Sequence, residues 1–270
     1  MDTEAQPTNF ALLIGINYFG SSCELKGCHQ DIDDVHQYLK SIGFLDSNIT
    51  VLKDSPTDLQ FLQESCPTRD NILKAMNDSV AKAHDGVLYI HYSGHGSNLQ
   101  YKSGDEKDGI DECICPVDCA TKDMIFDDEL RIVLVNNLRR TVKLRVVFDA
   151  CHSGSALDLP IRWDGSDHFE KENNKALRRD VIFISGCKDP QFSADSSFSG
   201  HPNGALTWAL LKSLTKIKKA TSTKNKLWNT YTWKDLGDAV RLNLKKEGYE
   251  QIPQISMMVQ EDLKKSIDIL

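Results

Sequence analysis

Two apolar segments of the sequence each run into a side chain that can take part in nucleophilic chemistry. Residues 87–96 read VLYIHYSGHG and place His95 between two glycines, and residues 144–154 read LRVVFDACHSG and place Cys151 before small residues. Ligands of open α/β sheets gather at the carboxyl ends of the strands. An imidazole and a thiol at neighbouring strand ends can form a dyad, in which the base raises the thiolate fraction and the thiolate attacks a carbonyl carbon.

Polar side chains accompany both of these residues. Because side chains alternate along an extended chain, Ser93 shares a face with His95, and Asp149 shares a face with Cys151. A carboxylate beside a nucleophile is costly unless it has a task, and holding a cationic substrate side chain is such a task. The pattern therefore favours an acidic substrate pocket next to the dyad.

Other candidate residues fit structural roles better. His91 lies further back in the apolar run and His152 points away from Cys151 in an extended chain, so His95 is the preferred base. Cys187 follows an Ile-Ser-Gly turn without a histidine motif, which favours a structural thiol. The paired Cys-x-x-Cys spacing of structural zinc sites is absent from the remaining central thiols, Cys113, Cys115 and Cys119. A metal hydrolase is disfavoured because the sequence has no His-Glu-x-x-His pattern.

Short β-branched runs alternate with amphipathic segments, which is typical of a largely parallel sheet covered by helices. The expected strands are residues 10–16, 49–52, 86–92, 143–149 and 180–185. The expected helices are residues 31–41, 68–83, 127–138, 204–219 and 232–246. An α/β fold follows, in which two strands end at the candidate base and nucleophile.

The chain of 270 residues is expected to form a single domain. A polar stretch, residues 162–179, is interpreted as an exposed linker between a larger section, residues 1–161, and a smaller one, residues 180–270.

Composition narrows the class of protein. The net charge of −7 disfavours a nucleic-acid binder, which needs clustered cations to neutralise phosphates. No apolar stretch has the length of a membrane span, and the acidic N-terminus lacks the features of a secretory signal. A cytoplasmic protein is expected, with its eight cysteines as thiols rather than disulfides.

The segments YSGHG and DACHSG resemble the catalytic pair of the metacaspases, relatives of the caspases with the caspase-haemoglobinase fold. The resemblance extends over nearly the whole chain, through residues 11–18, 25–28, 184–189, 193–195 and 253–256. It implies a cysteine-type endopeptidase with a caspase-like, mostly parallel β-sheet sandwiched between helices. The sequence shows no Pro-rich or zinc-finger prodomain and no long insertion between its sections, so it resembles a type I catalytic core.

The resemblance also implies roles for individual residues. His95 corresponds to the base and Cys151 to the nucleophile, and the backbone N–H groups of Gly96 and Cys151 correspond to an oxyanion hole. The family's pocket for Arg or Lys corresponds to Cys28, Asp31, Ser93 and Asp149. Its calcium-binding positions correspond to Asp111, Asp127, Asp128 and Asp158, and such oxygen ligands suit this hard cation.

The resulting hypothesis is a monomeric, calcium-dependent peptidase that cleaves protein or peptide substrates after Arg or Lys. Self-cleavage is expected within residues 162–179, which offer Lys171, Lys175, Arg178 and Arg179. The alternative is a catalytically dispensable caspase-like scaffold that acts in protein interaction or aggregate handling. The presence of both His95 and Cys151 favours the enzyme.

Overall fold

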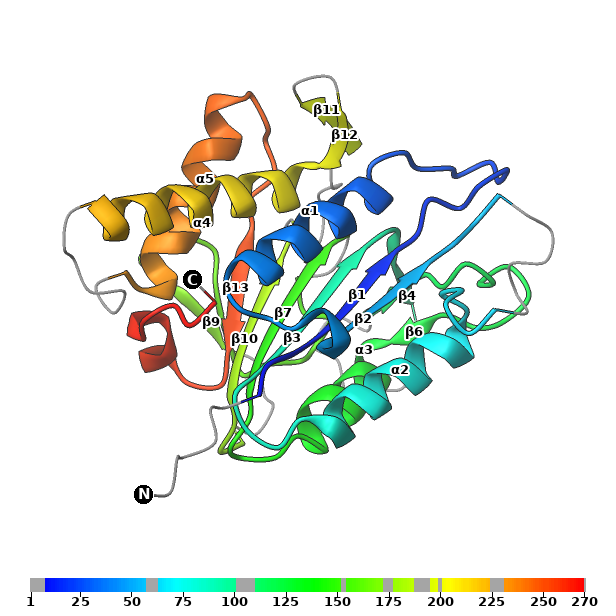
Figure 1. Cartoon of the computed structure of the whole chain (residues 1–270), viewed down its shortest axis with the longest axis horizontal. Coiled ribbons are helices and arrows are strands. Elements are labelled where there is room, and N and C mark those ends of the chain that lie inside the picture. The colour runs from blue at the N-terminus through cyan, green and yellow to red at the C-terminus, as the bar shows by residue number, and fades with distance from the viewer. Residues whose placement is uncertain are drawn as a thin grey trace.

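The computed structural model describes residues 8–56, 63–100, 110–151, 154–171, 177–186, 195–198, 201–223 and 231–269. An eight-stranded sheet in the order β2-β1-β3-β7-β10-β13-β8-β9 forms its centre (Figure 1). Five strands run parallel: β2 (Ile49–Lys53), β1 (Phe10–Gly15), β3 (Val87–Ser93), β7 (Lys143–Asp149) and β10 (Asp180–Ser185). The five predicted strands are thereby confirmed to within one residue at each end.

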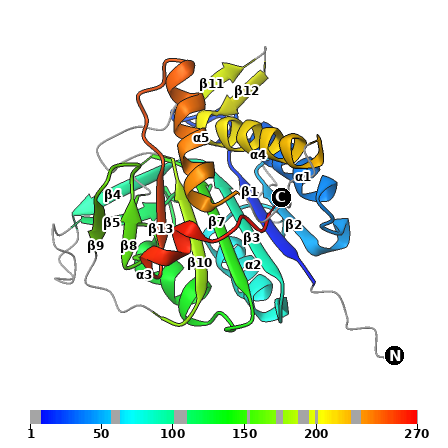
Figure 2. The ribbon, with the colours of Figure 1, turned by 90° about the vertical axis from the view of Figure 1, so that its left-hand side faces the viewer.

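Helices cover both faces of this sheet (Figures 1 and 2). One layer contains α1 (Cys28–Ser41), α4 (Ala205–Thr223) and α5 (Trp233–Lys246). The other contains α2 (Arg69–Lys82) and α3 (Asp127–Leu130), which continues as a π-helix over Arg131–Asn136. Alternate residues of β1 feed the two cores, since Leu12 joins the core under α2 and Leu13 joins the core under α1, α4 and α5. The predicted sandwich of a mostly parallel sheet between helices is confirmed.

Local capping explains where two of the predicted helices begin. The Thr68 hydroxyl accepts a hydrogen bond from the Asn71 N–H at 3.3 Å, which caps α2. At α5, the Thr232 hydroxyl accepts from the Asp235 N–H, and the Asp235 carboxylate accepts from the Thr232 N–H. In the part of the chain that the structure describes, 3₁₀ turns lie at Asp46–Asn48 and Gln260–Lys264.

Residues 165–168 of the predicted linker, residues 162–179, are exposed, but the stretch also contributes two short strands to the sheet, which the sequence pattern did not predict. β13 (Gln254–Met257), β8 (Ile161–Trp163) and β9 (Phe169–Lys171) extend the sheet, each antiparallel to the strand before it. Trp163 is 2% exposed, and the Arg241 guanidinium lies 4.1 Å from the centre of its ring. Strands of three residues are too short to show a period of two, so the pattern missed them. Residues 172–176 lie outside the described part of the chain.

Further strands that the pattern missed lie outside the main sheet. β4 (Gly96–Gln100), β5 (Ile110–Ile114) and β6 (Ile125–Phe126) form a small antiparallel sheet. β11 (Asp195–Phe198) and β12 (His201–Gly204) pair as a hairpin directly before α4. β4 begins directly after His95, and β12 ends at Gly204, whose N–H donates to Asp31.

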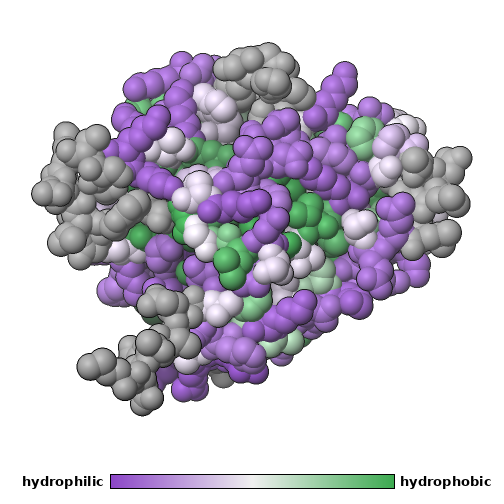
Figure 3. All heavy atoms as spheres, in the orientation of Figure 1, coloured by the Kyte–Doolittle hydropathy of each residue, from purple (hydrophilic) through white to green (hydrophobic). Residues whose placement is uncertain are grey.

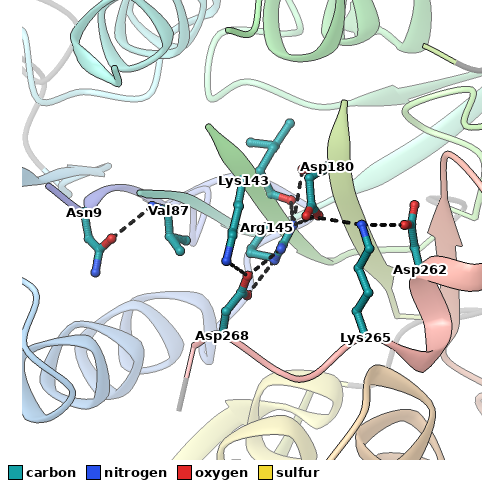
Figure 4. Close-up of polar contacts among 9 residues, drawn as sticks. Asn9, Val87, Lys143, Arg145, Asp180, Asp262, Lys265 and Asp268 are labelled. Atoms are coloured by element: carbon teal, nitrogen blue, oxygen red, sulfur yellow. Dashed lines mark hydrogen bonds and ion pairs between the residues drawn. The ribbon is translucent and has the colours of Figure 1, made fainter. Parts of the chain in front are cut away.

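An ionic network centred on the buried Arg145 joins the two sections of the chain (Figure 4). Arg145 on β7 is 2% exposed and pairs with Asp180 on β10 at 2.9 Å and with Asp268 at 2.6 Å. Lys265 pairs with Asp180 at 3.4 Å and with Asp262 at 2.8 Å. Although burial alone would raise the pKa of Asp180, these cations lower it.

Hydrophilic side chains cover most of the face seen in Figure 3, with hydrophobic ones showing between them near its middle. Among the helices that the structure describes, none combines the length and the apolar character needed to cross a membrane.

Candidate active site

The candidate base and nucleophile follow adjacent strands. β3 and β7 pair in parallel, with Ser93 opposite Asp149, and the Gly94 N–H donates to the Asp149 carbonyl at 3.3 Å. His95 and Cys151 each lie two residues beyond this last pair, and both are partly exposed. The structure thus brings the two predicted residues to the same edge of the sheet.

Gly96 and Cys151, the predicted oxyanion-hole residues, belong to backbone segments that touch. A Cβ atom added at Gly96 would lie 2.1 Å from the Cys151 carbonyl oxygen. No side chain fits in that space, so glycine is required for the two strand ends to approach. His152 falls outside the described residues.

The His95 imidazole has a fixed orientation. Its Nε2 atom lies 2.7 Å from the Cys23 carbonyl oxygen. Because a carbonyl oxygen can only accept, Nε2 carries a proton, and the neutral ring keeps Nδ1 as its basic nitrogen. Sequence reasoning missed Cys23, since a backbone acceptor leaves no mark on residue type.

The predicted pocket contains two buried carboxylates. The Ser93 hydroxyl donates to Asp31 at 2.6 Å, and the Gly204 N–H donates to both Asp31 carboxylate oxygens at 2.8 and 3.0 Å. A Cβ atom at Gly204 would lie 2.6 Å from an Asp31 oxygen and 2.2 Å from an Asp149 oxygen. Both carboxylates therefore lie within one side chain's reach of Gly204. Cys28 is buried one helical turn before Asp31, at the start of α1.

A chain of hydrogen bonds through Thr207, His91 and Tyr89 holds the Asp149 carboxylate. Thr207 donates to one Asp149 oxygen through its N–H at 2.8 Å and its hydroxyl at 2.9 Å. Since that hydroxyl has a single proton, His91 Nε2 donates to Thr207 Oγ1 at 3.0 Å, and the Tyr89 hydroxyl lies 3.1 Å from His91 Nδ1. Burial lowers the pKa of His91 to about 3, so this histidine is neutral. The interpretation of His91 as structural agrees with these contacts.

Thr207 was missed by sequence reasoning. It is the third residue of α4, where backbone N–H groups have no partner inside the helix and favour an anion. A threonine in the first turn of a predicted helix was the available signal, but it could not indicate which carboxylate it would meet.

Three of the four predicted calcium ligands lie near one another. Asp127, the first residue of α3, accepts from the N–H groups of Glu112 at 2.9 Å and Asp128 at 2.8 Å. Burial, together with the charges of Asp111 and Asp128, raises the pKa of Asp127 to about 6. Because burial and neighbouring negative charges disfavour the ionised form of Asp127, a nearby cation would stabilise that form.

Asp158 belongs to the loop after Cys151, which is tied to the same region. Its backbone has a left-handed φ of 46°, and Arg131, directly after α3, donates to its carbonyl. The Glu112 carboxylate accepts from the Ser155 N–H in that loop at 2.7 Å. The oxygen donor set thus fits a hard cation. Within the described residues, however, no three carboxylate, imidazole or thiol groups already stand in a metal-binding arrangement.

The central thiols match the structural interpretation. Cys113 contacts the Met124 sulfur at 3.1 Å and donates to the Ser97 carbonyl at 3.2 Å. The nearby Cys113 thiol and burial raise the pKa of Cys115 to about 12, which keeps this thiol protonated. Cys187 lies outside the described residues.

Comparisons with known proteins identify the family. Residues 10–160 match the model of the metacaspase, peptidase C14 domain. Metacaspase-1 of Meyerozyma guilliermondii is 34% identical over 94% of this chain and 70% of its own length. Metacaspase-1 of Mycosarcoma maydis is 33% identical over 91% of this chain and 69% of its own length.

The fold has a more distant counterpart. A crystal structure of a Geobacter sulfurreducens protein superposes with a TM-score of 0.63 at 23% identity, covering 96% of this chain and 98% of that one. This likeness concerns the fold alone. With the family match and the Metacaspase-1 relatives, the caspase-like sheet and its strand-end cysteine and histidine lead to one conclusion: the chain belongs to the metacaspase family of C14 cysteine endopeptidases.

Proposed function

We propose that the chain is a calcium-dependent endopeptidase that cleaves after Arg or Lys, with Cys151 as nucleophile and His95 as base. The main support is the pairing of β3 with β7, which brings His95 and Cys151 to one edge of the sheet, beside the Asp31 and Asp149 carboxylates. The family relationship supplies the peptidase chemistry.

In the proposed mechanism, His95 Nδ1 takes the thiol proton of Cys151, and the thiolate attacks the scissile carbonyl carbon. The N–H groups of Gly96 and Cys151 stabilise the resulting oxyanion. The imidazolium then gives its proton to the leaving amine, which leaves a thioester on Cys151. His95 deprotonates a water molecule that hydrolyses this thioester.

The proposed specificity depends on charge. A substrate Arg or Lys side chain that reaches Asp31 and Asp149 would meet two carboxylates whose hydrogen bonds already favour the ionised form. An Asp side chain would be repelled there. Ser93, which donates to Asp31, and Cys28 complete the proposed pocket.

The proposed calcium ligands are Asp111, Asp127, Asp128 and Asp158. Bound there, the ion would supply positive charge to a cluster in which burial and like charges oppose ionisation. Hydrogen bonds of Arg131 and Glu112 connect α3 and β5 to the loop after Cys151. Calcium that orders this cluster would therefore also order the end of β7, where Cys151 lies.

Peptide hydrolysis tests the proposal directly. Purified protein is assayed on fluorogenic peptides that differ only in Arg, Lys or Asp before the scissile bond, with calcium or with chelator. Calcium-dependent cleavage of the Arg and Lys peptides, absent in Cys151→Ala, is expected. A folded wild type without turnover would favour the scaffold alternative, and equal cleavage of the Asp peptide would refute the proposed pocket.

A further inference from the structure

Tyr18 has an unusual backbone conformation for a bulky residue. Its φ is 53°, in the left-handed region, and among the described non-glycine residues only Asp158 shares a positive φ. That conformation is unfavourable for a residue with a Cβ atom, because the Cβ atom lies too close to the following carbonyl oxygen. Such strain persists where surrounding contacts hold it, and it is common at functional sites.

The Tyr18 hydroxyl supports the turn that carries His95. It accepts a hydrogen bond from the His95 N–H at 2.9 Å and donates to the Cys115 carbonyl at 2.6 Å. Burial raises the pKa of Tyr18 well above its usual range, so the hydroxyl stays neutral and keeps the proton that it donates.

Tyr92 holds the other backbone group of the same residue. Its hydroxyl donates to the His95 carbonyl at 2.7 Å and lies 3.0 Å from the Tyr18 hydroxyl. The His95 carbonyl also accepts from the Cys115 N–H at 3.1 Å. The N–H of His95 thus depends on Tyr18, whereas its carbonyl has two donors.

The Tyr18 ring contacts the His95 imidazole itself. The ring centroids are 4.7 Å apart and the planes are tilted by 40°. Cys23, five residues further along the same loop, binds His95 Nε2 through its carbonyl. The loop after β1 therefore holds the imidazole at one nitrogen and against one ring face, which leaves Nδ1 for proton exchange.

We propose that Tyr18 is a positioning residue for His95, which fixes the backbone of the base through its hydroxyl and the rotation of the imidazole through its ring. This inference rests on the proposed function, because it assigns a task relative to His95 as the base. Loss of the hydroxyl would leave the His95 N–H without its partner and loosen the angle at which Nδ1 meets the Cys151 thiol.

The test compares three Tyr→Phe variants. Tyr18→Phe removes the support of the His95 N–H, and Tyr92→Phe removes one of two donors to its carbonyl. Tyr38→Phe is the matched control, because its hydroxyl donates to the Ile269 carbonyl at 2.9 Å instead. The readouts are kcat and KM on the Arg peptide in calcium, and the rate at which iodoacetamide alkylates Cys151, followed on the Cys151 peptide by mass spectrometry.

Tyr18→Phe should lower kcat by roughly 10- to 100-fold with little change in KM, and should slow alkylation of Cys151. Tyr92→Phe should have a smaller effect in the same direction, and Tyr38→Phe none. A Tyr18→Phe enzyme equal to Tyr38→Phe in both readouts would overturn the inference. If Tyr18→Phe does not fold, Tyr92→Phe decides. A lower kcat and slower Cys151 alkylation in Tyr92→Phe than in Tyr38→Phe would support the positioning role, and equal values would refute it.

His95→Ala separates this inference from the proposed function. If His95→Ala alkylates as fast as wild type, the proposed dyad fails, and the positioning role fails with it. If His95→Ala slows alkylation while Tyr18→Phe does not, only the role of Tyr18 is refuted.

Discussion

At the scale of single residues, the proposed chemistry depends on hydrogen bonds that set the charge and direction of each group. Cys23 sets which imidazole nitrogen of His95 is basic, and Thr207 holds the carboxylate of Asp149. Neither contact involves the reacting atoms. Substitutions of the reacting groups should therefore abolish activity, whereas substitutions of the residues that hold them should only lower it.

Removal of either member of the proposed dyad should abolish turnover. Cys151→Ala lacks the nucleophile and His95→Ala lacks its activator, and since dyads act as a unit, the double variant should be little worse than either single one. Peptide hydrolysis and circular dichroism of the three variants check this. Substantial turnover by folded Cys151→Ala would contradict the mechanism.

Thr207→Val should weaken cleavage after Arg. The variant keeps the backbone N–H to Asp149 but loses the hydroxyl donor and the acceptor of His91, so kcat/KM on the Arg peptide should fall roughly tenfold. Asp31→Asn and Asp149→Asn remove the negative charge itself. Each should therefore lower kcat/KM on the Arg peptide by more, equivalent to about 2–5 kcal/mol of transition-state stabilisation.

Thr207→Ser is the matched control, because it restores the hydroxyl, and it should recover most of the activity. Wild-type Arg hydrolysis by folded Thr207→Val would show that this hydroxyl does not tune the pocket.

At the scale of elements, the loops that follow β3 and β7 carry both the proposed dyad and the proposed calcium ligands. β5 and α3 bring Asp111, Asp127 and Asp128 together, and Arg131 links them to the loop of Asp158. The elements that hold the proposed calcium ligands are thus continuous with those that present His95 and Cys151.

Replacing Asp127 and Asp128 together with Asn should raise the calcium concentration needed for activity or abolish the response. The change removes two of the proposed hard anionic ligands and leaves His95 and Cys151 unchanged. Calcium titrations of peptide hydrolysis measure the effect, with Asp123→Asn as an exposed carboxylate control. Magnesium should substitute poorly. Full wild-type activity in excess chelator would refute the switch, and a normal calcium response in the double variant would refute the placement.

Self-cleavage should occur before β10 rather than in β9. Lys171 is paired within β9, whereas Arg178 is exposed and lies outside any strand, and proteolysis prefers such backbone. Active enzyme and Cys151→Ala are incubated in calcium, and new termini are mapped by mass spectrometry. Termini after Arg178 or Arg179 in the active sample alone are expected. Equal intact masses in both samples would count against self-cleavage.

At the scale of the whole molecule, one sheet contains strands from both sections of the chain. The interior of the protein around this sheet holds titratable groups. The Arg145 network joins β7, β10 and the segment near the C-terminus (Figure 4). His91 lies in the interior as a neutral imidazole. The free energy of unfolding should therefore depend on pH.

Acid should destabilise the fold through His91. Its pKa is about 3 in the folded chain and near 6.5 when unfolded, so the unfolded state binds the proton first as pH falls. This contribution is complete above pH 6.5 and is lost between that pH and about 3, which amounts to about 2 kcal/mol between pH 7 and 5. The lowered pKa of Asp180 adds a loss in the same direction at lower pH.

Urea unfolding at pH 7 and pH 5, in a Cys151→Ala background that prevents self-digestion, measures this dependence. His91→Gln should show a smaller difference between the two pH values, whereas His168→Gln, at an exposed position, should behave like the parent. An unchanged pH dependence in folded His91→Gln would contradict the assignment.

Much of the fold and the candidate dyad could be predicted from the sequence, because both depend on patterns within short segments of the chain. Apolar runs predicted the five parallel strands, amphipathic segments predicted α2 and α5, and the strand ends pointed to His95 and Cys151. The resemblance of these segments to the metacaspases supplied the pocket and calcium residues.

Tertiary structure decided the rest, because the contacts concerned join distant segments through groups that leave no periodic signal. Thr207 meets Asp149 across 58 positions, and Gly204 meets Asp31 across 173. β8 and β9 are too short to show a pattern, and their hydrogen-bonded partners are β13 for β8 and β8 for β9. The left-handed backbone of Tyr18 is strained in isolation, and it persists because its hydroxyl and ring are bound by residues 77 and 97 positions away.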